Sequence, residues 1–471
     1  MRTRPGRAMG STRPGPGEAR PTRADLRVQA AICCEGEGRT RKAEREYLAA
    51  LEIAPHHPVA LNNLGLLLAA RGRFKEALRL FARAVRADPR DEVAHLNLAG
   101  ALREVGDAAG ATQAYSNILA ANPHSRAARL NLANVLRAQG DLGAARPYYM
   151  TLLQGDPRDG LARWNLAALD GLAGDFNAAF AGFALHHALQ PAAPPPPGLA
   201  RWRGEPLGGR RILLEAHQGL GDTIMFARFA RLVRDCGGRV ILRAQRELAA
   251  LISRVEGVEH FAPGDEPAPG ADLWFPLADL PALPGFCAPD SCAAPYIGAP
   301  ADRAAPWAIR LPQTGRLRVG LVWAGNPTHP DDRNRSIPLQ TLLAALSEVA
   351  NIELVSLQKG ARAAEADGGP LTRADLEIAD FLDTAAALAR LDLLISVDTS
   401  VLHLAGAMGR PAWALLPFAP DWRWRIEGDE TPWYPSLRLL RQPRPGDWTA
   451  VVAQAAAALR VRAPQPARQA G

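Results

Sequence analysis

The carboxylate best suited to proton transfer belongs to Asp222, where an apolar segment gives way to a helical pattern. Residues 211–216 (RILLEA) are typical of a buried strand, and His217-Gln-Gly-Leu-Gly-Asp222 follows directly. Gly219 and Gly221 permit a tight turn and the close approach of a ligand to the backbone. Asp222 can act there as a general base, or it can simply cap the following helix. The spacing leaves both roles open.

A second polar group follows a later strand. Residues 393–397 (LLISV) run into Asp398, Thr399 and Ser400, and a helical pattern covers 401–408. The unpaired amides and the dipole at the start of a helix attract anions, which makes this turn a candidate phosphate site. The alternative is that Asp398 or Thr399 only caps the helix.

Possible phosphate-binding cations lie at two further strand ends. The expected strand 352–357 ends at Gln358 and Lys359, and Lys359 is one of only three lysines in a chain rich in arginine. A lysine where arginine usually serves suggests a compact phosphate-binding cation. Arg333 and Arg335 lie in the loop after the expected strand 319–323 and can clamp a diphosphate, although a solvated loop would look the same.

Two blocks of alternating strand and helix must position these residues, one over 210–312 and one over 313–460. This alternation is typical of doubly wound parallel sheets, which bind ligands at the carboxyl ends of their strands. We therefore predict two Rossmann-type lobes with a cleft between them. The expected elements are strands 211–216 and 240–243 with helices 223–236 and 247–255 in the first block, and strands 319–323, 352–357, 392–397 and 413–416 in the second.

Several chemistries are disfavoured by the same residues. A dinucleotide fingerprint would need a glycine where Ile224 stands and an acidic residue where Arg243 stands, so NAD is not expected. No Asp-x-Asp triplet, P-loop, G-x-S-x-G or H-E-x-x-H motif occurs. We expect neither a metal nor a cofactor, so cations and helix dipoles would have to stabilise any leaving phosphate.

The first half of the chain repeats every 34 residues. Each unit predicts a helix, a turn at a glycine that tolerates a left-handed backbone, a second helix with a small alanine at the helix contact, and a proline stop. Three columns carry this period: Gly38, Gly72, Gly106, Gly140 and Gly174; Ala43, Ala77, Ala111, Ala145 and Ala179; Pro55, Pro89, Pro123, Pro157 and Pro191.

A fourth column concerns binding. Asn63, Asn97, Asn131 and Asn165 recur at one position of the first helix in units two to five. An amide both donates and accepts, so a ladder of asparagines can hold the backbone of an extended peptide. The alternative is that each asparagine bonds a neighbouring helix within the array.

Charge and composition bound the remaining possibilities. The chain has 471 residues, 48% of them hydrophobic, and a formal net charge of +7. That charge is concentrated in the segments 1–23 and 461–471, which we expect to be disordered tails, so the folded body is balanced and no nucleic-acid groove is expected. Residues 192–209 are expected to be a proline-rich linker. No secretory signal or membrane span is predicted, and a cytoplasmic location is the default.

These motifs resemble two known families. Residues 24–191 resemble a tetratricopeptide array of five repeats, whose first helices line a concave, partner-binding face. Residues 208–460 are similar to heptosyltransferase-type glycosyltransferases (family 9), a two-lobed GT-B fold, through Gly219-Leu-Gly-Asp222, the segment 319–338 and the segment 396–411. The expected fold class is therefore α + α/β, an α-solenoid followed by a GT-B-like pair of lobes.

The resemblance also implies roles. It maps the general base of the family onto Asp222 and the contacts to donor sugar and diphosphate onto Asp398 and Thr399. This chain departs from the family in having only Arg333 or Arg335 in place of a phosphate-binding lysine, and Gln358-Lys359 in place of an acidic residue near the ribose. The donor therefore need not be ADP-heptose.

The function expected from these roles is metal-independent, inverting transfer from a nucleotide-diphosphate sugar to a hydroxyl acceptor. The repeats would recruit a protein partner or acceptor, and association with a membrane surface stays open. The alternative is a non-catalytic scaffold that carries a degenerate sugar-nucleotide-binding domain.

Overall fold

The computed structural model describes residues 20–463 apart from 265, 267–269, 287–294 and 330. The expected tails 1–23 and 461–471 therefore lie almost wholly outside the described residues. The chain forms two compact units, residues 1–157 and 158–471.

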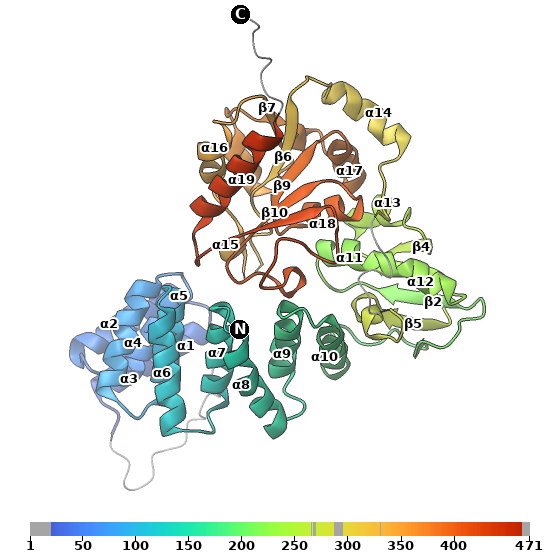
Figure 1. Cartoon of the computed structure of the whole chain (residues 1–471). Helices are drawn as coiled ribbons and strands as arrows, with labels where there is room; N and C mark the ends of the chain where they lie inside the picture. The colour runs from blue at the N-terminus through green and yellow to red at the C-terminus, as the bar shows by residue number, and fades with distance from the viewer. Residues whose placement is uncertain (1–19, 265, 267–269, 287–294, 330, 464–471) are drawn as a thin grey trace, which may run out of the picture. The chain divides into compact units, whose positions relative to one another are not determined.

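The first unit consists of four helix pairs (Figure 1). Each second helix ends two residues before its proline, and the four glycines between paired helices have φ between 73° and 87°, so these predictions of the repeat pattern are confirmed. The alanine column is fully buried. The helices are α1 (Arg23–Gly36), α2 (Thr40–Ile53), α3 (Pro58–Ala69), α4 (Phe74–Ala87), α5 (Glu92–Glu104), α6 (Ala108–Ala121), α7 (Arg126–Ala138) and α8 (Leu142–Gly155).

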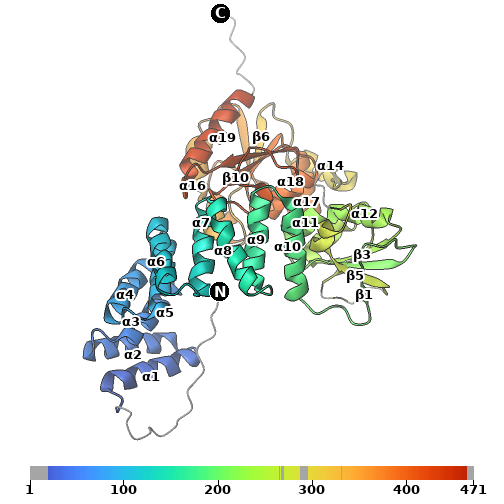
Figure 2. The same cartoon turned by 60° about the horizontal axis from the view of Figure 1, so that its bottom comes forward.

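The second unit begins with the fifth helix pair, α9 (Gly160–Leu172) and α10 (Phe176–Leu189), which lie side by side in Figure 2. Ten helices thus form the five expected repeats over 23–189, but the fifth repeat belongs to the same compact unit as the sheets. Its aromatic side chains explain this grouping. The Phe180 ring centroid lies 5.4 Å from that of Trp422 and 6.1 Å from that of Phe226.

The front sheet has five parallel strands in the order β1-β5-β2-β3-β4. Its first strand, at the edge, comes from the expected linker 192–209, because the Trp202 amide donates to the Trp274 carbonyl (3.0 Å) and the Trp202 side chain is buried. The linker is therefore partly a strand. The strands are β1 (Ala200–Arg201), β2 (Arg211–Glu215), β3 (Arg239–Ala244), β4 (Val258–Pro263) and β5 (Leu273–Pro276).

The helices of the front sheet are shorter than predicted. The expected helix 223–236 starts earlier and is divided by a 3-10 turn, and the expected helix 247–255 keeps only a short α-helical part. Buried Arg228 bends its side chain back to the Met225 carbonyl (2.8 Å) at the division. The elements are α11 (Leu220–Phe226), η1 (Ala227–Phe229), α12 (Ala230–Asp235), η2 (Arg246–Leu248), α13 (Ala249–Ile252) and η3 (Leu277–Ala282).

The rear sheet has six parallel strands in the order β11-β10-β9-β6-β7-β8. Numbered along the chain within this sheet, the order is that of a doubly wound Rossmann sheet. From β6 the chain adds strands first on one side (β7, β8) and then on the other (β9, β10, β11). Sheets of this kind bind ligands at the point between β6 and β9 where the order reverses. The strands are β6 (Leu317–Val322), β7 (Ile352–Ser356), β8 (Thr372–Arg373), β9 (Leu393–Val397), β10 (Ala412–Leu416) and β11 (Leu437–Arg441).

Helices cover the rear sheet. One face is filled by Trp323, Ile395, Leu346 and other fully buried side chains against α16 and α19. Residues 301–310, which the sequence assigns to the front lobe, pack as α14 on α17 through Arg303, which pairs with Asp383 (2.9 Å). The helices are α14 (Ala301–Arg310), α15 (Asp332–Arg335), α16 (Leu339–Leu346), α17 (Phe381–Ala389), α18 (Ser400–Ala407) and α19 (Trp448–Arg462), with 3-10 turns η5 (Ala361–Ala366), η6 (Ala374–Leu376) and η7 (Trp422–Trp424).

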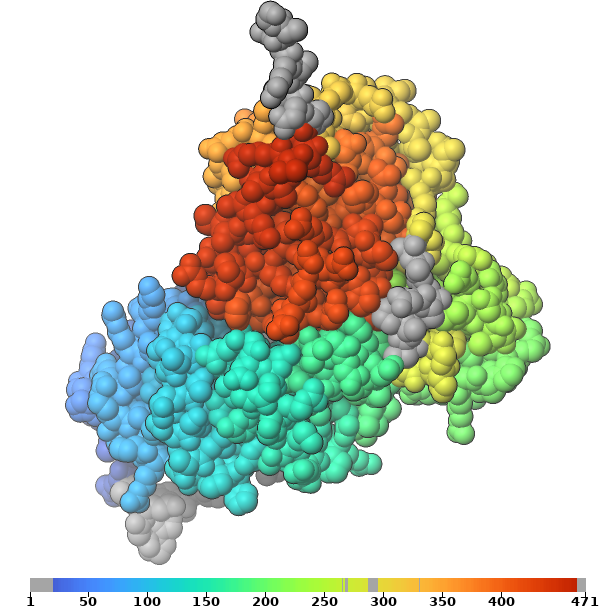
Figure 3. All heavy atoms as spheres, in the orientation of Figure 1, coloured from blue at the N-terminus to red at the C-terminus, as the bar shows by residue number. Residues whose placement is uncertain are grey.

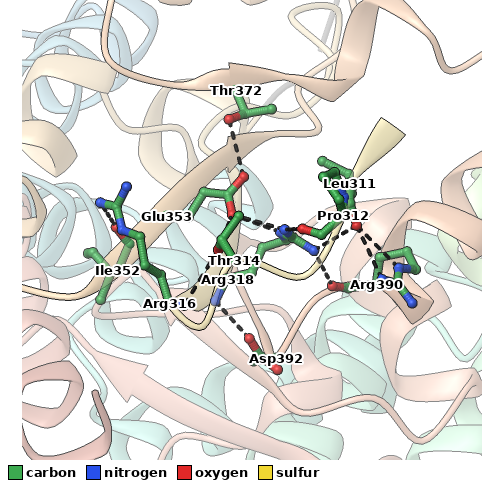
Figure 4. Close-up of polar contacts among 10 residues, drawn as sticks. All are labelled: Leu311, Pro312, Thr314, Arg316, Arg318, Ile352, Glu353, Thr372, Arg390 and Asp392. Carbon is green, nitrogen blue, oxygen red and sulfur yellow. Dashed lines mark hydrogen bonds and ion pairs between the residues drawn. The ribbon is translucent and has the colours of Figure 1, made fainter. Parts of the chain in front are cut away.

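A buried ionic network fixes the amino ends of the rear strands (Figure 4). Arg318 on β6 is 4% exposed and its guanidinium donates to Glu353 on β7 (3.1 Å) and to the carbonyls of Leu311 (3.0 Å) and Pro312. Its backbone amide donates to the Asp392 carboxylate (2.7 Å). All these groups are mutually satisfied and lie at the end of the sheet opposite Asp398, which indicates a structural role.

Candidate functional site

The candidate site lies at the carboxyl ends of β2, β6, β9 and β10, where each strand runs into a loop or helix. Asp222 comes from the front sheet, and Asp398 and Arg335 come from the rear sheet. Asp222 pairs with Arg423, an arginine in the segment between β10 and β11, and the charges of Arg423 and Arg335 both act on Asp398.

Asp222 is the third residue of α11, not the residue before it. Its Oδ2 accepts the Gly219 amide (3.0 Å), so it satisfies one of the free amides at the helix start from inside the first turn. The capping role left open by the sequence is thus present in this form. The other oxygen, Oδ1, forms an ion pair with Arg423, and the Asp222 side chain remains 22% exposed.

Arg423 is the residue that sequence analysis missed. Its Nη2 donates to Asp222, its Nη1 donates to Asp421 (2.5 Å), and its guanidinium lies 4.4 Å from the Trp422 ring centre. Burial alone would lower the pKa of Arg423, but the carboxylates of Asp222, Asp421 and Asp398 raise it above its ordinary value. The guanidinium therefore stays charged, and its position after β10 is the one sequence signal that could have identified it.

The turn after β9 holds the expected phosphate-site residues. Thr399 is the N-cap of α18, and its hydroxyl lies 3.1 Å from that of Ser396, while Ser400 is the first helical residue. Asp398 is 15% exposed. Burial raises its pKa above the ordinary value and the Asp421 carboxylate raises it further, whereas Arg423 and Arg335 oppose the rise. The Thr399 side chain does not cap the helix, so the first amides of α18 keep donor capacity.

His403 on α18 lies buried between Asp398 and Tyr434. Its Nδ1 lies 3.0 Å from the Tyr434 hydroxyl and its Nε2 lies 3.7 Å from Asp398 Oδ1. Burial, assisted by the charge of Arg423, lowers the pKa of His403 to about 3, so the ring is neutral at pH 7. A neutral, buried imidazole here positions its neighbours and is not an acid or base near neutral pH.

Gly219 and Gly221 have structural roles that differ from the expected tight turn and ligand approach. Gly219 has φ −69° and ψ 167°, an extended backbone open to any residue, so no tight left-handed turn is required. Gly221 lies within α11, and a Cβ there would be 2.7 Å from His403 Cδ2. Its absent side chain permits the close packing of α11 on α18, which brings Asp222 to the rear sheet.

The expected cations are divided between two environments. Arg335, on α15, lies against Gly325 and 3.6 Å from Asp332, and its charge acts on Asp398, so it belongs to the site. Arg333, on the same short helix, is exposed.

Gln358 and Lys359 differ from the expectation, because both side chains bind backbone groups of the rear sheet. The Gln358 amide accepts the backbone amides of Trp323 and Ala324 (2.9 Å each) and donates to two carbonyls, which uses its whole hydrogen-bonding capacity. Lys359 Nζ donates to the carbonyls of Asp375 and Ile378 (2.9 Å each). Both side chains therefore hold loops of the rear sheet together.

The asparagine column follows the within-array alternative, a bond to a neighbouring helix, at two of its four members. Asn63 Nδ2 donates to the Tyr47 hydroxyl (3.2 Å), and Asn97 Nδ2 donates to Asn62 Oδ1 (2.8 Å). Asn165 Nδ2 donates to the Leu161 carbonyl of its own helix (2.8 Å). Asn131 is half-buried on α7. Each amide can form further hydrogen bonds, so binding of a peptide backbone stays a prediction.

Aromatic residues join the fifth repeat to the segment that carries Arg423. Trp422 is 6% exposed, and its ring centroid lies 5.4 Å from that of Phe180 and 5.2 Å from that of Phe183 on α10. In the space-filling view, green atoms of the fifth repeat abut the orange-red atoms of this segment (Figure 3). On α9, a Cβ at Gly171 would lie 3.0 Å from Trp422, so the glycine leaves room for the indole. Trp422 and Trp433 therefore both pack against the fifth repeat.

Comparison with known proteins defines the class of the repeats. Residues 17–90 and 102–169 match two family models described as tetratricopeptide repeat. The helical array is therefore a tetratricopeptide solenoid. No helix among the described residues is long and apolar enough to cross a membrane.

One curated relative extends beyond the repeats. Protein FlbA of Caulobacter vibrioides (strain ATCC 19089 / CIP 103742 / CB 15) is 31% identical over 297 residues, which are 56% of this chain and 48% of FlbA. The chain thus spans about half the length of the curated relative it matches.

Solved tetratricopeptide structures are also similar to this chain. YrrB, a TPR protein with an unusual peptide-binding site, is 19% identical with a TM-score of 0.31, covering 35% of this chain and 86% of YrrB. PilW, a type IV pilus biogenesis factor, is 20% identical with a TM-score of 0.34, covering 36% of this chain and 79% of PilW.

Proposed function

We propose that the chain is a glycosyltransferase that transfers a sugar from a nucleotide-diphosphate donor to a hydroxyl acceptor with inversion and without a metal. The observation that carries the proposal is that Asp222 pairs with Arg423 while α11 packs on α18 at Gly221, which brings Asp222 to the helix that follows Asp398. A base and an anion site on facing sheet edges are what acceptor activation and leaving-group stabilisation require.

In this mechanism Asp222 takes the proton of the acceptor hydroxyl as the oxygen attacks the anomeric carbon. The bond between that carbon and the phosphate oxygen breaks, and the nucleotide diphosphate leaves with the electron pair. The free amides of Thr399, Ser400 and Val401, with Arg335, stabilise the negative charge on the phosphate. His403 stays neutral and is held by its hydrogen bond with the Tyr434 hydroxyl.

The tetratricopeptide array supplies the second half of the proposed function. Solenoids of stacked repeats offer extended concave surfaces for partners. We assign to the array the recruitment of a protein acceptor or partner, through the asparagine column and the side chains beside it.

A second candidate is a non-catalytic scaffold. The observation that favours it is the ion pair between Asp222 and Arg423, since a carboxylate paired with a guanidinium is a weaker base. In a scaffold this pair would be permanent and serve only to hold the two sheets together.

A donor panel distinguishes the two candidates. The full chain is incubated with nucleotide-diphosphate and nucleotide-monophosphate sugars, nucleotide release is measured, and acceptors are sought by mass spectrometry. Transferase function predicts release with at least one donor, its loss in Asp222→Asn, and retained nucleotide binding in that variant. Asp235→Asn, on α12 with a 52% exposed side chain, is the matched control. No thermal stabilisation by any nucleotide or donor would favour the scaffold.

A further inference from the structure

Arg423 has one cationic group and several anionic neighbours. Its Nη1 and Nη2 are engaged by Asp421 and Asp222, and Asp398 adds a third carboxylate to its surroundings. Its Nε is buried and has no hydrogen-bond partner among the described residues. A guanidinium has five N–H donors in a fixed fork, so this one keeps at least one donor unused.

The backbone on both sides of Arg423 is held by contacts of the neighbouring residues. Trp422 is packed against α10, and Trp424 lies 5.4 Å from the His403 ring, measured between centroids. Arg441 donates to the Arg425 carbonyl (3.0 Å), and Arg425 itself holds a left-handed φ of 56°. The long side chain of Arg423 can therefore exchange partners while the segment stays in place.

An anion that entered this site would compete with Asp222 for Arg423. The carboxylates of Asp222, Asp398 and Asp421 outnumber the nearby guanidinium groups of Arg423 and Arg335. A phosphate approaching the start of α18 gains most if Arg423 turns to it, because charge-assisted bidentate contacts are the strongest available. The turn removes the charge-assisted donor from Asp222 Oδ1.

We propose that Arg423 is a phosphate-binding residue of the donor site and that the donor phosphate and the Asp222 carboxylate compete for its guanidinium. This inference rests on the proposed function and deepens it. Asp222 is engaged while the donor site is empty and is released for the acceptor hydroxyl when the donor binds. Donor binding therefore precedes activation of the acceptor.

Nucleotide binding tests the competition directly in the full chain. ADP, GDP, UDP and CMP are titrated by isothermal calorimetry into wild type, Asp222→Asn, Arg423→Gln and Arg423→Lys. Asp222→Asn removes the competing carboxylate and is expected to lower the dissociation constant of the nucleotide about tenfold, because a hydrogen bond to a charged group contributes about that much free energy or more. Arg423→Gln is expected to weaken it by about ten- to a hundredfold, with a smaller loss in Arg423→Lys.

A control and a double variant separate this role from a structural one. Arg438→Gln, at the amino end of β11, is expected to bind as wild type does. In Asp222→Asn/Arg423→Gln the gain from Asp222→Asn should vanish, because no guanidinium is left to be released. Unfolding midpoints without nucleotide show which variants are folded, and Arg423→Lys keeps the buried positive charge.

Two results would overturn the inference in distinguishable ways. If a nucleotide binds wild type but Asp222→Asn does not tighten it, the competition is refuted and the proposed function stands. If none of the four nucleotides binds wild type, the inference and the proposed function fall together.

Discussion

Trp422 offers the most direct test of whether the fifth repeat is part of the fold that carries the site. Its side chain lies among Phe176, Phe180 and Phe183 of α10, with ring centroids between 5.2 and 6.3 Å away. Trp433 adds a further edge-on contact at 6.4 Å. Trp422→Ala removes the centre of this cluster and leaves the rest of the rear sheet unchanged.

The expected loss can be worked from burial. A tryptophan buries about 150–250 Å², which at about 25 cal/mol per Å² corresponds to about 4–6 kcal/mol. Measured substitutions of a buried aromatic residue by alanine cost about 3–5 kcal/mol. Trp422 is 6% exposed, so we expect a loss of about 4 kcal/mol in the unfolding free energy of residues 158–471. That is a large share of the about 5–15 kcal/mol that stabilises a folded protein.

The assay combines denaturant unfolding with hydrogen exchange of the full chain. Trp422→Ala should lower the unfolding free energy and speed exchange in α9 and α10 more than in α16 and α19. Trp164→Ala is the matched control, because Trp164 contacts Phe183 at 4.6 Å but is 37% exposed. A loss below about 1 kcal/mol in Trp422→Ala, or unchanged protection of α9 and α10, would refute the docking of the fifth repeat.

Two further predictions concern buried charge. Burial lowers the pKa of His403 from the ordinary 6.5 to about 3 in the folded chain. Between pH 3 and pH 6.5 the histidine therefore binds a proton only in the unfolded chain, so the folded state loses stability as the pH drops below 6.5. The advantage of wild type over His403→Gln in unfolding free energy should shrink by about 2 kcal/mol from pH 7 to pH 5, and equal pH slopes would contradict this. Arg318→Met removes a buried guanidinium from the half-buried Glu353 carboxylate, which keeps only the hydroxyls of Thr314 and Thr372, and should cost about 3 kcal/mol in denaturant unfolding. Arg444→Met, whose side chain is 83% exposed, should cost little, and similar losses in both variants would reject the network's importance.

The repeats could be predicted because their determinants are local and periodic. A glycine such as Gly106 is required by its own φ of 87°, and an alanine such as Ala111 by the contact of two adjacent helices. Neither depends on distant residues, so the 34-residue period carries the information. What the period could not indicate is that Phe176 and Phe180 of the last repeat bury against the rear sheet, since their partners lie more than two hundred residues away.

The candidate site could be predicted only where one strand end determines it. Asp222 and Asp398 each follow a buried strand, and the rule that ligands lie at carboxyl ends of strands identified both. Gln358 follows a strand too, but its amide is consumed by the backbone of Trp323 and Ala324, which only the three-dimensional pairing of β6 and β7 reveals. Arg423 was missed because its partner Asp222 follows a strand of the other sheet and is about two hundred residues away in the sequence.

The adjacency of Trp422 and Arg423 connects the repeats to the proposed chemistry. Trp422 is fixed by α10, and the Ile426 amide donates to the Leu172 carbonyl at the end of α9 (2.9 Å), so the fifth repeat holds the segment on both sides of Arg423. Arg423 in turn engages Asp222. We therefore expect a change in the packing of α9 and α10 to reach the proposed base through Trp422 and Arg423, which are covalently linked. Of the five repeats, the fifth is thus the one whose helices contact the segment that carries Arg423.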